Sequence, residues 1–163
     1  MSEEQILGPI LKHSDQLLAM IKDKAGVELD YSLGSLLHLD KILEHLFGKG
    51  MSSIPRGEEM EEVWSALRVQ IACYYGECIR RTFSGVWAQD EKMGIIVKEI
   101  GNLDVTIHPL HTAFDRLNGE DYKIFFTTKV LCDKLFKQIN EKHYHLGEQA
   151  KPSPATPPPL PPN

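Results

Sequence analysis

Glu77 and the arginines that follow it are the residues whose types and spacing come closest to a catalytic set. Arg80 and Arg81 come three and four positions after Glu77, so a helix would place the three side chains on one face. A carboxylate with a partner and a cleft can act as a general acid or base. A small enzyme using Glu77, Arg80 and Arg116, and also His108, is therefore one alternative. The other is structural, with Glu77 tying its helix to neighbouring arginines, to Arg116 or to backbone N–H groups.

Histidines offer a second possible chemistry, because two pairs are closely spaced. His108 and His111 flank a proline turn, and His143 and His145 form a His-x-His pair. Imidazoles suit zinc and similar metals, so a His-based metal site is a further alternative. The two pairs are more than thirty residues apart in the chain, and the sequence has no His-Glu-x-x-His motif. We therefore predict no metal and no other cofactor.

The three cysteines are Cys73, Cys78 and Cys132, an odd number in a chain without a recognisable export signal. We expect reduced thiols in the cytoplasm. None is expected at a helix N-terminus, where a thiol becomes reactive, so a role as small apolar core residues is favoured over nucleophilic catalysis. Phosphate-binding glycine loops are also absent from the sequence.

Gly76 stands inside the pattern of a long helix, where glycine costs about 1 kcal/mol relative to alanine. A ligand could approach the backbone closely there. The favoured interpretation is packing, with Trp87 of a following strand covering the gap.

The C-terminal segment is rich in proline, with seven prolines in residues 151–163. Such a segment cannot bury enough surface to fold, so we predict a disordered tail over 148–163 and a single folded domain over 1–147. Segments in the polyproline II conformation can bind in aromatic grooves of other proteins, and one stretch of this segment is typical of such a ligand. It consists of Pro158, Pro159, Leu160 and Pro161. The alternative is a solubilising extension.

The elements that would position these residues are predicted from hydrophobic period. Helices are expected near 32–46, 58–83, 110–118 and 122–143, and the pattern of a first helix runs from Ser2 or Glu3, with Ser2 as a possible N-cap, to about Lys24. Pro9 favours a start of that first helix at Pro9, or a bend there. The third helix is expected to be the spine of the fold. Its expected inward residues are Val63, Leu67, Ile71, Tyr74 and Ile79.

Three short strands are predicted between the third helix and the helix at 110–118. They cover 86–89, 95–100 and 103–107, with turns at 90–94 and 101–102. The predicted fold class is α+β, with an N-terminal helical pair. Its long central helix packs on a three-stranded antiparallel meander, and C-terminal helices close the core.

The charge balance restricts the classes of partner. The 163 residues carry 18 Lys plus Arg and 23 Asp plus Glu, a net charge of −5. This disfavours nucleic-acid binding, which needs phosphate neutralisation. No apolar run reaches the roughly 18–20 residues that span a bilayer, so no membrane partner is expected. An acidic surface suits a protein partner of complementary, basic charge.

An ordered series of motifs resembles small bacterial domains that have no assigned activity. The series is Tyr74-Tyr75-Gly76-Glu77, then Gly85-Val86-Trp87, His108-Pro109 and Arg116-Leu117-Asn118-Gly119. The resemblance covers about residues 60–140 and implies a bacterial α+β domain. Some small bacterial proteins of this kind act as immunity or accessory proteins. Together with the absence of a coherent catalytic set, this predicts a non-catalytic cytoplasmic protein that acts by protein–protein interaction, with the oligomeric state left open.

Overall fold

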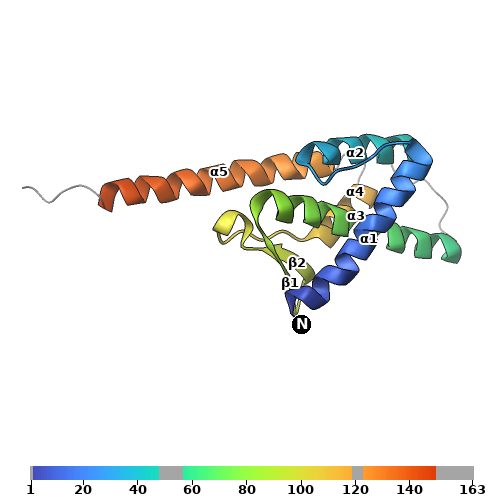
Figure 1. The fold of residues 1–163 in the computed structure, drawn as a ribbon, viewed down its shortest axis with the longest axis horizontal. Helices are drawn as coiled ribbons and strands as arrows, with labels where there is room; N and C mark the ends of the chain where they lie inside the picture. The colour runs from blue at the N-terminus through green and yellow to red at the C-terminus, as the bar shows by residue number, and fades with distance from the viewer. Residues whose placement is uncertain (1, 48–56, 119–122, 150–163) are drawn as a thin grey trace, which may run out of the picture.

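The computed structural model describes residues 2–47, 57–118 and 123–149, and shows a mostly helical α+β fold with one small sheet (Figure 1). Five helices and two strands follow one another in the described chain. In order they are α1 (Glu3–Ala25), α2 (Leu33–Phe47), α3 (Glu58–Phe83), β1 (Val86–Asp90), β2 (Gly94–Lys98), α4 (Pro109–Asn118) and α5 (Ile124–Gln149). The tail residues Pro158, Pro159, Leu160 and Pro161 lie outside the described residues.

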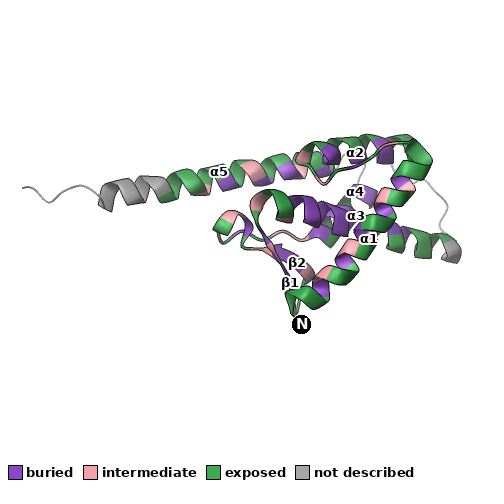
Figure 2. Ribbon diagram, in the orientation of Figure 1, coloured by how far each residue is buried: buried purple, intermediate pink, exposed green. Residues whose placement is uncertain are grey.

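Helix α3 is the spine, as predicted, and its expected limits of 58 and 83 are confirmed. Helices α1 and α4 pack against it, and its middle turns are almost completely buried (Figure 2). Leu67, Ile71, Tyr74 and Ile79 point inward as expected. The prediction for Val63 is wrong, since its side chain is 58% exposed. The first turns of α3 extend past the helices that cover its middle (Figure 1).

The predicted three-stranded meander is wrong, because the sheet has only β1 and β2 in the described chain. They form an antiparallel hairpin that pairs Trp87 with Val97. After β2 the backbone takes left-handed conformations at Glu99 and Gly101, with φ of 57° and 68°, and forms a 3-10 turn. The segment predicted as a third strand then touches β2 by a single bridge between Val97 and Ile107.

Helix α1 confirms the start predicted at Ser2 or Glu3, and the alternative start at Pro9 is wrong. It begins at Glu3 and continues through Pro9. A capping box closes its first turn, because the Ser2 side chain accepts from the Gln5 N–H and the Gln5 side chain accepts from the Ser2 N–H. Gly8 also helps, since the residue before a proline resists helical geometry partly through its Cβ, which glycine lacks.

Helix α5 is longer than predicted and runs to Gln149, past the expected end of the helix at 143. Its first turns bury Ile124, Leu131 and Leu135 against the body. Its C-terminal half extends away from all the other helices (Figure 1). Within residues 2–47, 57–118 and 123–149, no helix has the length and apolar character that crossing a bilayer requires.

Candidate functional site

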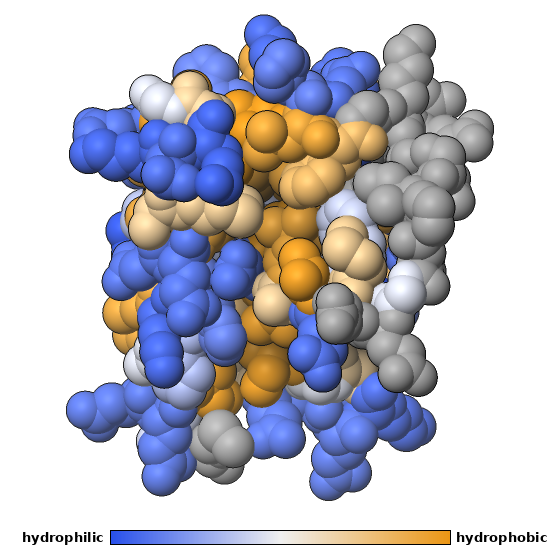
Figure 3. Space-filling model, turned by 90° about the vertical axis from the view of Figure 1, so that its right-hand side faces the viewer, coloured by the Kyte–Doolittle hydropathy of each residue, from blue (hydrophilic) through white to orange (hydrophobic). Residues whose placement is uncertain are grey.

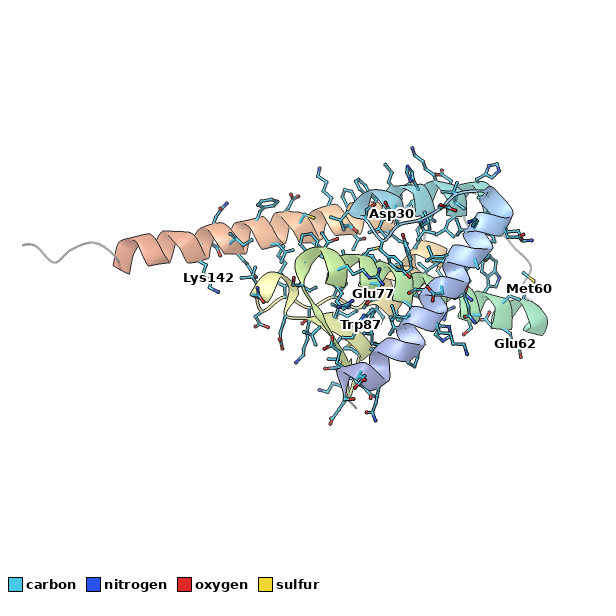
Figure 4. All side chains as sticks on the ribbon, in the orientation of Figure 1. Asp30, Met60, Glu62, Glu77, Trp87 and Lys142 are labelled. Carbon is cyan, nitrogen blue, oxygen red and sulfur yellow. The ribbon has the colours of Figure 1, made fainter. Side chains whose placement is uncertain are left out.

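Glu77 lies in the centre of the molecule, with its side chain 0% exposed. Its Oε1 accepts from Arg80 Nε at 2.6 Å and from Trp87 Nε1 at 2.7 Å. Its Oε2 accepts from Arg81 Nε at 2.8 Å and from Arg80 Nη2 at 3.2 Å. Figure 4 shows Glu77 and Trp87 together between α3 and the hairpin. Each carboxylate oxygen therefore holds two donors, which joins the end of α3 to β1.

The electrostatics of this cluster favour an ionised Glu77. Burial acts to raise the pKa of the carboxyl, but the hydrogen bonds from Arg80, Trp87 and Arg81 outweigh it and hold the pKa below its usual range. A general base needs a free lone pair directed at its substrate. With four donors in place, Glu77 is bound as a structural anchor.

Gly76 allows the indole of Trp87 to lie directly on α3, as the sequence predicted. A Cβ added at Gly76 would lie 2.1 Å from Cη2 and 2.4 Å from Cζ2 of Trp87. No real Cβ tolerates such distances, so the glycine is required by packing. Trp87 is 2% exposed, and the contact with Gly76 orients its Nε1–H toward Glu77.

Arg81 extends the cluster toward the segment between α1 and α2. Its guanidinium carbon lies 3.8 Å from the ring centroid of Tyr31, a cation–π contact. The backbone N–H of Tyr31 donates to the Tyr74 hydroxyl at 3.1 Å, and that hydroxyl lies 2.6 Å from Ser35 Oγ. One polar network thus joins the segment between α1 and α2, the first turn of α2, and α3.

Arg116 does not join Glu77, so the structure separates the residues of the enzyme hypothesis. Its Nε donates to Asp40 Oδ1 at 2.8 Å, and both side chains are buried, at 8% and 2% exposed. Asp40 also accepts the backbone N–H of Ile124 at 3.2 Å and of Phe125 at 2.8 Å. One carboxylate therefore joins α2, α4 and the N-terminal end of α5, where a negative charge is favourable.

Sequence reasoning missed Asp40, although a signal was present. The apolar face of its helix contains Leu36, Leu39 and Leu43, and Asp40 falls between them at helical spacing. A carboxylate on a buried face requires a charged or N–H partner. Which partner it takes depends on tertiary packing across 76 residues of chain.

The histidines and cysteines show no assembled site among the described residues. The ring centroids of His108 and His111 lie 6.2 Å apart. Among the described residues, no group of three or more His, Cys, Asp or Glu side chains could hold a metal ion. The side chains of His143 and His145 lie outside the described part. Burial raises the pKa of the Cys73 and Cys78 thiols to about 12, so both stay protonated near neutrality.

An exposed feature of the fold is a row of apolar side chains on α5, which we name the α5 stripe. It consists of Phe125, Cys132, Phe136 and Ile139. These positions lie within about 60° of one another around a helix. Phe136 is 67% exposed and Phe125 and Ile139 are each 38% exposed. Leu135 is the last buried residue of the described α5 side chains, so the stripe continues where the helix has left the body (Figure 2).

A second hydrophobic area lies at the end of the molecule where α3 begins. Figure 3 shows it as a band of hydrophobic residues between hydrophilic margins. Met60, labelled at this end in Figure 4, is 36% exposed and Val63 is 58% exposed.

Comparison with known proteins identifies no relative. No family model, no curated protein and no solved structure matches the chain. The resemblance to small bacterial domains stays a prediction.

Proposed function

We propose that this protein is a non-catalytic accessory protein of the cytoplasm that binds another protein through the α5 stripe. The observation that carries the proposal is the exposure of Phe136 and its neighbours on a helix that extends beyond the body. An aromatic side chain at 67% exposure gains far more from burial in an interface than the polar groups around it.

The spacing of the stripe indicates the shape of the partner. Phe125, Cys132 and Ile139 follow one another at intervals of seven residues, and Phe136 lies between the last two. Apolar residues repeated at seven-residue intervals pack against another helix by inserting knobs into holes. A partner that lays an amphipathic helix along α5 would cover the stripe.

The local charge indicates the chemistry of that helix. Residues 124–142 contain four lysines and two acidic residues, a net charge of +2, whereas the whole chain carries −5. An acidic helix therefore complements this surface best. The basic partner expected from the overall charge would instead suit other parts of the molecule.

The buried clusters support a non-catalytic role. Glu77 has its oxygens occupied by Arg80, Arg81 and Trp87, and Arg116 is engaged with Asp40. Using either charge in catalysis would require breaking contacts that hold elements of the fold together. No geometry in the described chain favours the enzyme hypothesis over this one.

The experiment is affinity capture from native lysate with two matched variants of the full chain. Phe136→Ser changes the α5 stripe, whereas Phe126→Ser changes a phenylalanine of equal exposure, 65% against 67%, on another side of the same helix. Phe126 lies about 100° around the helix from Phe125. We expect wild type and Phe126→Ser to retain the same protein, and Phe136→Ser to lose it.

The captured protein should contain an acidic amphipathic helix, and its binding should weaken as salt increases. Equal capture by Phe136→Ser and Phe126→Ser would contradict the proposal. A protein lost from both variants would also contradict it, because the effect would then come from α5 as a whole rather than from the stripe.

A further inference from the structure

A pocket of about 280 Å³ opens between α1, α3, the hairpin and the start of α4. It does not involve α5 and is independent of the proposed function. The residues that matter for its chemistry come from four elements. They are Ile6 and Ile10 of α1, Ala72 and Cys73 of α3, Trp87 of β1 and Pro109 of α4.

The size of the pocket defines the size of its ligand. An apolar cavity of about 150 Å³ in another protein stays dry and binds benzene. The pocket here is close to twice that volume. It therefore accommodates a molecule of about ten carbon atoms, the size of two fused rings.

The chemical class follows from the lining, which contains no lysine, arginine, aspartate or glutamate. His13 also lines the pocket, and its Nδ1 lies 3.1 Å from Gln16 Oε1. A charged ligand would lose its water with no carboxylate, lysine or arginine to pair with. The thiol of Cys73 is neutral, because burial raises its pKa to about 12. One oxygen that belongs to the lining, Gln5 Oε1, is already engaged with the Ser2 N–H at 2.9 Å. An uncharged ligand is therefore favoured.

Trp87 supplies a fixed edge of the wall, since its side chain lines the pocket but is 2% exposed. Its ring is held against Gly76, and its Nε1–H is bonded to Glu77 at 2.7 Å, so the indole cannot turn away from the pocket. The ring of Pro109, a second rigid group of the lining, lies beside the indole, since Pro109 Cγ and Trp87 both approach Gly76. Preformed rigid walls bind a ligand at low entropic cost.

We propose that this pocket binds an uncharged, apolar molecule of about ten carbon atoms in contact with Trp87. The Glu77 cluster then has a second consequence, because it fixes the indole edge that the ligand touches. The ligand would be recognised by shape and burial, with little contribution from charge.

The test is isothermal titration calorimetry of the full chain with 1-naphthol, and with 1-naphthalenesulfonate as the charged probe. Ala72→Leu adds side-chain volume to the pocket wall, whereas Ala66→Leu makes the same change at an exposed position of the same helix. We expect naphthol to bind wild type and Ala66→Leu equally and to bind Ala72→Leu about tenfold more weakly or not at all. The sulfonate should bind at least about tenfold more weakly than naphthol.

Nuclear magnetic resonance of wild type provides a readout that does not depend on Ala72→Leu folding. The indole N–H signal of Trp87 should shift on addition of naphthol, while the signal of Trp64, which does not line the pocket, stays in place. A Trp64→Phe variant assigns the two signals. Absence of naphthol binding, equal binding by Ala72→Leu, or equal affinity for the sulfonate would overturn the proposal. A shift of Trp64 alone would also overturn it.

Discussion

The contact between Gly76 and Trp87 makes a quantitative prediction about stability. In Gly76→Ala the new Cβ would lie 2.1 Å from the indole and 3.1 Å from Pro109 Cγ. Overpacking of this kind costs about 1–3 kcal/mol. If the indole moves to relieve it, the hydrogen bond from Nε1 to the Glu77 carboxylate is lost, which costs about 1.5–3 kcal/mol more.

Alanine recovers about 1 kcal/mol of helix propensity relative to glycine. The expected net loss in the free energy of unfolding is therefore about 1.5–5 kcal/mol. Urea unfolding followed by far-UV circular dichroism measures it. Gly34→Ala is the control, because a Cβ at Gly34 would meet only Ser32 Oγ at an ordinary 3.6 Å. It should leave stability unchanged or raise it by up to about 1 kcal/mol.

A double-mutant cycle tests the cause of the loss. In a Trp87→Leu background the atoms that collide with the new Cβ are absent, so Gly76→Ala should cost about 1 kcal/mol or less. If Gly76→Ala is as stable as wild type, or costs the same with and without Trp87, the reasoning about this contact is refuted.

Three further predictions follow from the buried charges and thiols. Asp40→Ala should lower the free energy of unfolding by about 3–5 kcal/mol in urea titrations, because it leaves a buried arginine unpaired. The pKa of Glu77 is lowered in the fold, so its contribution to stability is present above the ordinary value of 4.5 and is lost as the pH falls through the folded value. Glu77→Gln should therefore be less stable than wild type near neutrality and should lose less stability on acidification, measured by urea midpoints at several pH values. A chromogenic disulfide reagent should react with the half-buried Cys132 in the folded protein, at a rate limited by a pKa that burial raises, while the buried Cys73 and Cys78 react only after unfolding.

Each of these predictions has a result that would contradict it. Asp40→Ala would contradict the account if its stability stayed within about 0.5 kcal/mol of wild type, as is usual for exposed positions. Parallel pH profiles for wild type and Glu77→Gln would show that the carboxylate is not held ionised by its partners. Release of three equivalents of chromophore from the folded protein would show that the α3 thiols are accessible.

The spacing of apolar residues was enough to predict that the helices exist, because a long run with apolar residues every three or four positions fits few structures other than a helix. The limits of α3 are confirmed, and so is the contact of Trp87 with Gly76. The third strand was predicted wrongly because the alternation of apolar and polar residues in 103–107 indicates which side chains are buried. It does not indicate which backbone groups form hydrogen bonds with a neighbouring strand. Left-handed residues such as Glu99 turn the chain away from the sheet, and Glu99 is a poor sequence signal for that conformation.

The candidate site was predictable only in part. Local spacing brought Glu77, Arg80 and Arg81 together, since residues three and four apart share a helix face. The separation of Arg116 from Glu77 depends on how α4 packs against α2, which local spacing does not contain. The exposure of the α5 stripe could not be predicted for a related reason. The sequence pattern of an apolar helix face is the same whether or not other elements cover that face.

Site-specific photo-crosslinking inside cells tests the proposed interaction most directly. A benzophenone amino acid is introduced at position 136 or 126, replacing Phe136 or Phe126, two phenylalanines of equal exposure on one helix. The account predicts that the probe at 136 links the protein to one partner, at an acidic helix of that partner, while the probe at 126 does not. No crosslink from 136, or the same crosslinks from both positions, would contradict the claim that the α5 stripe is the binding surface.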